Sequence, residues 1–187
     1  MAKVVIKTAL RTVLIVLIAL IMTFGVASLA FPQHMATLFE QMGAYSFATG
    51  YSGLAYTYKK TTKNLSRCVD DSILAHDDEN IITYGEMLIE RSDFEDFAAD
   101  GYKQFVMGHI ACAKFNVGEK KEAVELAAKA MEGVEGFPLN NALAALSIRA
   151  AEKSDAEVKE ELYKIIINIQ PTEGQQDYYG AVIAILT

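Results

Sequence analysis

The chain has 187 residues, of which 52% are hydrophobic, and its 17 Lys and Arg against 24 Asp and Glu give a formal net charge of −7 at pH 7. Three basic residues precede the first acidic one and lie before Ala30, which leaves 14 basic against 24 acidic residues, or −10, for the rest of the chain. An acidic exterior repels phosphate backbones, so nucleic acid is excluded as the expected partner, and so is a domain lying flat on anionic lipid.

The longest uncharged stretch runs from Thr12 to Phe31 and reads TVLIVLIALIMTFGVASLAF. About 20 helical residues at about 1.5 Å each span the roughly 30 Å hydrocarbon core of a bilayer. We therefore predict a short basic segment at 1–11, a transmembrane helix acting as a signal anchor at 12–31, and a helical domain at 32–187. The alternative is a signal peptide cleaved near Ala30, where Ser28-Leu29-Ala30 supplies small residues, although such apolar regions usually have only about 7–15 residues.

The charges that flank the span predict its orientation. Lys3, Lys7 and Arg11 precede it, and no basic residue occurs in the 27 residues that follow Phe31. Because positive charge stays in the cytoplasm, we expect a single-pass protein of the cell membrane with its N-terminus inside and its domain outside. A second uncharged segment, Met42–Tyr58, would return the domain to the cytoplasm if it also crossed the membrane. It is only weakly hydrophobic, and we expect a buried helix of the domain instead.

Two cysteines, Cys68 and Cys112, occur without a CxxC motif. Two thiols are too few for a disulfide scaffold, and single buried cysteines usually act as small apolar residues. A Cys68–Cys112 disulfide remains the alternative if the domain faces an oxidising space.

Beyond residue 60 the pattern is helical. Asp77-Asp78 begins a segment with apolar residues at helical spacing from Ile81 to Ile89. Ser92-Asp93-Phe94-Glu95 and Ser154-Asp155-Ala156-Glu157 each fit a capping box, in which the serine and glutamate side chains satisfy backbone N–H groups at a helix start.

The last of these predicted helices has one apolar stripe. Its members are Val158, Leu162, Ile165, Ile166 and Ile169. Pro171 is expected to end the helix. Strand patterns are almost absent, and the predicted connections (116–119, 133–138 and 153–155) are short. Short connections join antiparallel neighbours, so we predict an all-α domain of stacked helical hairpins.

The stretch from Ile110 to Met131 resembles the centre of a tetratricopeptide repeat. A large and a small residue lie in the first helix, an aromatic residue near its end, a glycine at the turn, and two small residues in the second helix where the backbones approach. The matching residues are Ile110, Ala111, Phe115, Gly118, Ala123 and Ala130. Met107 stands where the family has a tryptophan-like residue. The hairpins at 140–170 and 51–74 match more weakly, and a capping helix is expected near 176–186.

The resemblance implies a TPR-like α-solenoid that binds proteins on a concave face lined by the first helices. It places Lys103, Met107, Lys114 and Asn141 on that face as partner-binding residues. The alternative is that each is an ordinary surface or packing residue.

No pattern indicates catalysis or a cofactor. HExxH, GxSxG and P-loop motifs are absent, and the acidic residues after His76 suit a helix start better than a metal site. A His109–Cys112 pair has no third orienting group. We therefore expect no enzyme activity, no cofactor and no metal. The predicted function is a membrane-anchored interaction scaffold or assembly factor. The alternatives are a secreted helical protein and an accessory ligand-binding subunit of a membrane enzyme that uses the tyrosine-rich segment as a pocket.

Overall fold

The structure is a computed structural model, and it describes residues 2–99, 101–130 and 140–167 of the chain. All regular secondary structure in these ranges is helical, which confirms the predicted all-α class. In chain order the helices are α1 (Ala2–Ala30), α2 (Pro32–Gln41), α3 (Tyr45–Tyr58), α4 (Thr62–Ala75), α5 (Asp78–Ile89), α6 (Phe94–Phe97), α7 (Tyr102–Asn116), α8 (Lys120–Ala130), α9 (Asn140–Ala150) and α10 (Asp155–Ile166).

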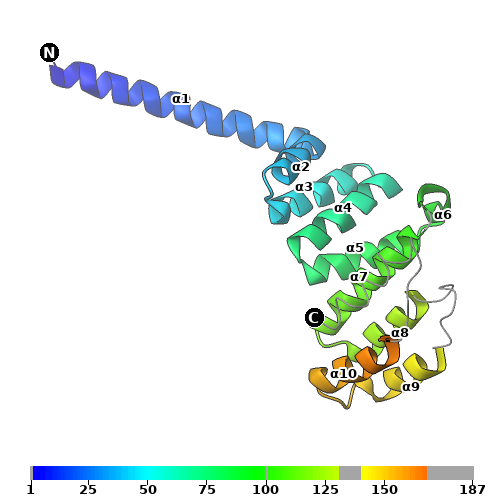
Figure 1. Ribbon diagram of the computed structural model, residues 1–187. Helices are drawn as coiled ribbons and strands as arrows, with labels where there is room; N and C mark the ends of the chain where they lie inside the picture. Colours follow the sequence, from blue (N-terminus) through cyan, green and yellow to red (C-terminus); the bar gives the residue numbers. More distant parts are fainter. Residues whose placement is uncertain (1, 100, 131–139, 168–187) are drawn as a thin grey trace.

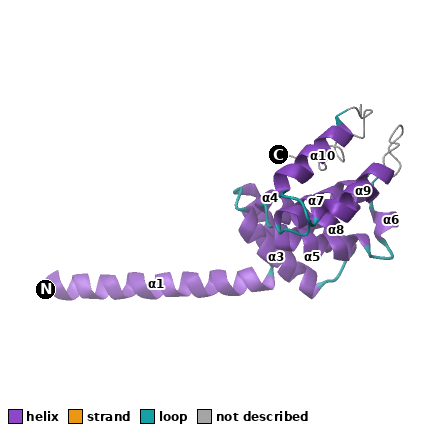
Figure 2. Cartoon of the chain, turned by 90° about the horizontal axis from the view of Figure 1, so that it is seen from below, coloured by secondary structure: helices purple, strands orange, loops and turns teal. Residues whose placement is uncertain are grey.

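The helix α1 extends away from the rest of the molecule, and the other helices stack into one elongated domain (Figures 1 and 2). The main packing partners are consecutive along the chain, from α2 with α3 to α9 with α10. The single-turn helix α6 is the exception, because α5 packs directly against α7. The predicted stack of antiparallel hairpins is therefore present.

The only helix in the described ranges that is long and apolar enough to cross a membrane is α1, over Arg11–Ala30. Its large apolar side chains from Val13 to Leu29 are exposed and do not pack into the core of the domain. Most of the segment Met42–Tyr58 instead forms α3, from Tyr45 onward, and this helix buries Ala48, Ser52 and Ala55 between α2 and α4. This confirms that it is a helix of the domain.

Side-chain caps define several helix starts. Asp77 accepts a hydrogen bond from the backbone N–H of Asn80 at 3.1 Å and begins α5. Ser154 and Glu157 form the predicted capping box of α10. The capping box predicted at Ser92 was wrong. There α6 has one turn, Asp93 occupies its N-cap position, and no side chain caps it. The Asp93 carboxylate instead accepts hydrogen bonds from Thr62 Oγ1 at 2.5 Å and Arg91 Nε at 2.8 Å.

The apolar core consists of two clusters that meet at α7. The first fills the space between α4, α5, α6 and α7, and the second joins α7 to α8, α9 and α10. Ile110 belongs to the first cluster, whereas its neighbour Ala111 and Phe115 belong to the second. Successive residues of one helix thus serve opposite halves of the stack.

The hairpin of α7 and α8 has the geometry predicted from its small residues. Gly118 makes the turn with φ +91°, a backbone conformation that favours glycine. Ala111, Ala123, Ala127 and Ala130 are all fully buried along the seam. The connection predicted at 133–138, Ile169, Pro171 and the capping helix predicted near 176–186 lie outside the described residues.

Candidate functional site

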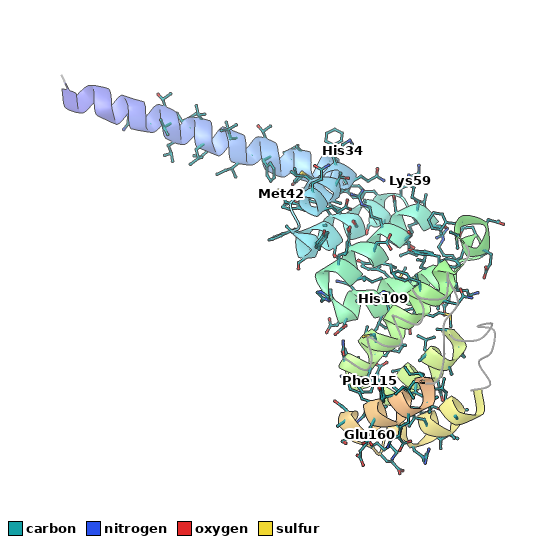
Figure 3. All side chains as sticks on the ribbon, viewed as in Figure 1. His34, Met42, Lys59, His109, Phe115 and Glu160 are labelled. Atoms are coloured by element: carbon teal, nitrogen blue, oxygen red, sulfur yellow. The ribbon has the colours of Figure 1, made fainter. Side chains whose placement is uncertain are left out.

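A cluster of polar side chains lies where α2, α3 and α4 meet, at the end of the domain nearest to α1 (Figure 3). Arg67 of α4 reaches across to α2. Its guanidinium lies 2.6 Å from the Glu40 carboxylate and donates to Thr37 Oγ1 at 2.6 Å and to the Gln33 carbonyl at 3.2 Å. The Gln33 amide in turn donates to Asn64 Oδ1 at 3.0 Å. These contacts fix the helix that follows the predicted span against the domain.

A buried carboxylate lies one turn further along α4. Asp71 is only 2% exposed and accepts a hydrogen bond from the hydroxyl of Ser52 on α3. Burial raises the pKa of Asp71 to about 6, the Ser52 hydrogen bond works in the opposite direction, and the charge of Glu40 adds to the increase.

Three open cavities surround this region. The largest, of about 880 Å³, has Gln33, Lys59, Lys63, Asn64, Arg67 and Asp70 in its lining. A second, of about 410 Å³, lies between α2 and Arg67. The third, of about 220 Å³, lies between the end of α1 and the end of α3, and Phe31, Tyr58 and Lys59 are among its lining residues. These cavities thus lie at the polar end of the domain, next to the end of the predicted span.

The residues predicted to bind a partner occupy different environments. The side chain of Lys103 is 42% exposed and its Nζ lies 2.6 Å from Glu95. Met107 is buried at 9% exposure. The side chain of Lys114 is 14% exposed, and its Nζ lies 2.9 Å from Glu86 and 3.0 Å from Glu119. Burial opposes the charge of Lys114, but the hydrogen bonds to the two glutamates outweigh it and raise its pKa.

These residues do not converge on one point. Lys103 and Lys114 lie near opposite ends of α7, about 16 Å apart along its axis at about 1.5 Å per residue. Asn141 lies in the first turn of α9. Their role in partner binding stays a prediction.

No group of three or more His, Cys, Asp or Glu side chains that could hold a metal ion occurs within the described ranges. His76 ends α4 in a left-handed conformation, with φ 52°. His109 packs edge-on against Phe105, with ring centroids 4.5 Å apart, and burial lowers its pKa. Both thiols are free, so the alternative of a Cys68–Cys112 disulfide is not realised in this structure.

Sequence reasoning did not single out Ser52, Glu40, Arg67 or Asp71. Arg67 and Asp71 are four residues apart, which places both on one face of a helix, and this spacing was the feature of the sequence that could have indicated them. Their partners lie 27 and 19 residues away, which periodicity cannot reveal.

Comparison with known proteins found no match among protein families, curated proteins or solved structures. The chain is therefore described as a helical protein with one N-terminal apolar helix, and the tetratricopeptide resemblance remains an expectation from the sequence.

Proposed function

We propose that this chain is a membrane-anchored scaffold for protein–protein interaction. In this proposal α1 holds the chain in the cell membrane with the N-terminus in the cytoplasm, and the stacked hairpins outside it bind a partner protein. The observation that carries the proposal is an exposed apolar helix joined directly to a stack of helical hairpins. An exposed apolar surface of this length needs lipid or another protein to cover it.

Two features of the stack support partner binding. Helices that pack mainly on their sequence neighbours form an extended array, and such arrays expose a long surface to a partner. The hairpin of α7 and α8 also has the glycine turn and buried small residues that carried the tetratricopeptide resemblance. That resemblance implies that α7, as a first helix, lines the binding face.

Lys103 is the best placed of the four predicted contact residues. Its side chain is more exposed than that of Lys114, and it forms its ion pair with a single carboxylate, whereas Lys114 contacts two. A carboxylate of a partner can replace one exposed ion-pair partner at little cost in free energy. Met107 would contact a partner only after a change in packing, because its side chain is buried.

The anchor is tested by fractionating cells that express the full chain with a tag after Thr187. We expect the protein to stay in the membrane pellet after alkaline carbonate extraction, with an intact mass that includes Met1 or begins at Ala2. A reporter enzyme that is active only outside the cytoplasm, fused at the same position, should be active. A soluble protein whose sequence begins near Phe31 would contradict the anchor and support the secreted alternative.

Partner binding is tested by placing a photo-crosslinking amino acid at position 103 in the full chain in intact cells. The matched control is position 129, an exposed lysine on α8, the second helix of the same hairpin. We expect a reproducible crosslinked protein at position 103 and a weaker or absent one at position 129. Equal crosslinking at both positions would contradict a binding face on α7.

A further inference from the structure

The turn between α3 and α4 and the first turn of α4 together carry three lysines whose charges are not neutralised. Lys59, Lys60 and Lys63 are exposed, and in the described ranges no acidic side chain forms an ion pair with them. Of the eleven other basic residues after Ala30, nine form ion pairs. In a domain with a net charge of −10 after Ala30, this turn is therefore an exceptional concentration of free positive charge.

The fold brings this turn back to the end of α1. Lys59 is 28 residues beyond Phe31 in the sequence, yet both line the cavity of about 220 Å³. Figure 3 shows Lys59 near His34, at the end of the domain where α1 joins it. Lys59 and Lys63 also line the adjoining cavity of about 880 Å³, together with Arg67. If α1 spans the bilayer, these cations lie at the level of the lipid headgroups.

The surroundings of the small cavity suit an interface between lipid and water. Phe31 and Tyr58 both line it and are 61% and 60% exposed. Tyrosine is favoured at headgroup level, because its ring contacts acyl chains while its hydroxyl contacts water, and the apolar ring of Phe31 suits the acyl side of the same boundary. The cavity thus has apolar side chains at the end of α1 and the Lys59 cation at the end of α3, which matches the two chemistries of a phospholipid.

We propose that Lys59, Lys60 and Lys63 bind the headgroup phosphate of an anionic phospholipid in the leaflet where α1 ends. The inference rests on the anchor of the proposed function and adds a specific lipid contact to it. The rest of the domain is acidic and is repelled by anionic lipid. The lysines therefore contact the membrane at one edge of the domain, and the other helices lie away from the lipid surface. A long polyanion such as nucleic acid would meet the acidic surface beyond this edge.

The test uses the full chain purified in a neutral detergent and freed of lipid. Equal amounts of phosphatidylglycerol and phosphatidylcholine are added, and retained lipid is counted by native mass spectrometry. We expect preferential retention of phosphatidylglycerol, reduced by about tenfold or more in Lys59→Gln/Lys60→Gln/Lys63→Gln, since each lysine near a lipid surface contributes severalfold to binding. Unchanged helical circular dichroism of the variant shows that it folds.

A matched variant, Lys121→Gln/Lys129→Gln/Lys164→Gln, removes the same charge from exposed positions on α8 and α10. It should retain phosphatidylglycerol like the wild type. Equal loss in both variants would overturn the proposal, because net charge alone would then explain binding. Retention of both lipids alike would also overturn it. So would inorganic phosphate that displaces phosphatidylglycerol at millimolar concentration, which would identify a site for free phosphate.

The two proposals fail in different ways. A carbonate-resistant membrane protein that shows no preference for phosphatidylglycerol keeps its anchor and loses only the lipid site. A soluble chain beginning near Phe31 loses the anchor, and the lipid site fails with it.

Discussion

The guanidinium of Arg67 on α4 lies 2.6 Å from the carboxylate of Glu40 on α2, and this ion pair joins the helix that follows α1 to the rest of the stack. Both side chains are less than one third exposed, and Arg67 also donates hydrogen bonds to Thr37 and Gln33. Loss of one partner would leave the other charge partly desolvated without compensation. We therefore expect the orientation of α2 to depend on this contact.

Arg67→Ala should therefore destabilise the domain by roughly 1–3 kcal/mol. Amide hydrogen exchange of α2 should accelerate more than that of α8, because the lost contacts all end on α2. The control is Arg149→Ala, whose ion pair with Glu161 at 3.4 Å involves a 57% exposed arginine. It should cost less than about 1 kcal/mol. Similar effects of the two substitutions would show that the Arg67 contacts do not fix α2.

The pH dependence of stability should reveal Asp71. Its pKa is raised to about 6 in the folded protein, above the usual value of 3.8, so the folded state binds this proton more tightly than the unfolded chain does. The contribution of Asp71 to the free energy of unfolding is therefore most favourable below about pH 4 and decreases as the pH rises to about 6. Asp71→Asn keeps an oxygen that accepts from Ser52 and removes this decrease.

The measurement is the melting temperature of wild type and Asp71→Asn between pH 4 and pH 7.5, followed by circular dichroism because the chain has no tryptophan. The melting temperature of Asp71→Asn should increase relative to that of the wild type as the pH rises. Glu122→Gln, which alters an exposed carboxylate on α8, is the control. If the wild type instead became more stable relative to Asp71→Asn as the pH rises, the upward shift of the Asp71 pKa on folding would be contradicted.

Close packing of α5 against α7 should make Gly85 intolerant of a side chain. A Cβ at Gly85 would lie 2.7 Å from Cγ1 and 2.8 Å from Cδ1 of the fully buried Ile110. Gly85→Ala should therefore destabilise the domain by about 1–3 kcal/mol through overpacking. Gly50→Ala is the matched control, because a Cβ there meets nothing within 4 Å. It should be neutral or stabilise by up to about 1 kcal/mol, since alanine favours a helix over glycine. Denaturant unfolding of both variants compares the two values.

The two thiols should differ in reactivity. Cys68 is fully buried, and burial raises its pKa to about 12, so almost none of it is thiolate at neutral pH. Cys112 is partly exposed. In the native full chain, N-ethylmaleimide should modify Cys112 first, and Cys68 should react only when urea unfolds the domain. Peptide masses measured after digestion locate the label. Equal rates for the two cysteines without urea would contradict the burial of Cys68.

The sequence was sufficient wherever a local pattern determines structure. The apolar run 12–31 predicted α1, Asp77 and Ser154 predicted helix starts, and Gly118 predicted the turn between α7 and α8. At Ser92 the same reasoning failed, because Thr62 and Arg91 hold Asp93 in a contact between residues up to 31 positions apart. A tertiary contact there overrides a local capping preference.

Distance along the sequence failed to predict which side chains lie beside the C-terminal end of α1. Counting along the chain gave no positive charge for 27 residues after Phe31, whereas the hairpin of α2 and α3 returns Lys59 to the same cavity. The buried contact of Ser52 with Asp71 was hidden for a similar reason, since each residue alone resembles an ordinary polar position. Which helices pack together must be known before such neighbours can be identified.

The stacking of each helix on its sequence neighbours also governs how the domain forms. Contacts between consecutive helices keep the contact order low, which favours rapid folding and lets a native segment form before the rest of the chain exists. Synthesis releases α2 and α3 before the later helices, so each later helix packs against a neighbour that can already have formed. The end of the domain next to α1 thus acts as the template for the rest, and local unfolding is expected to begin at the opposite end of the stack.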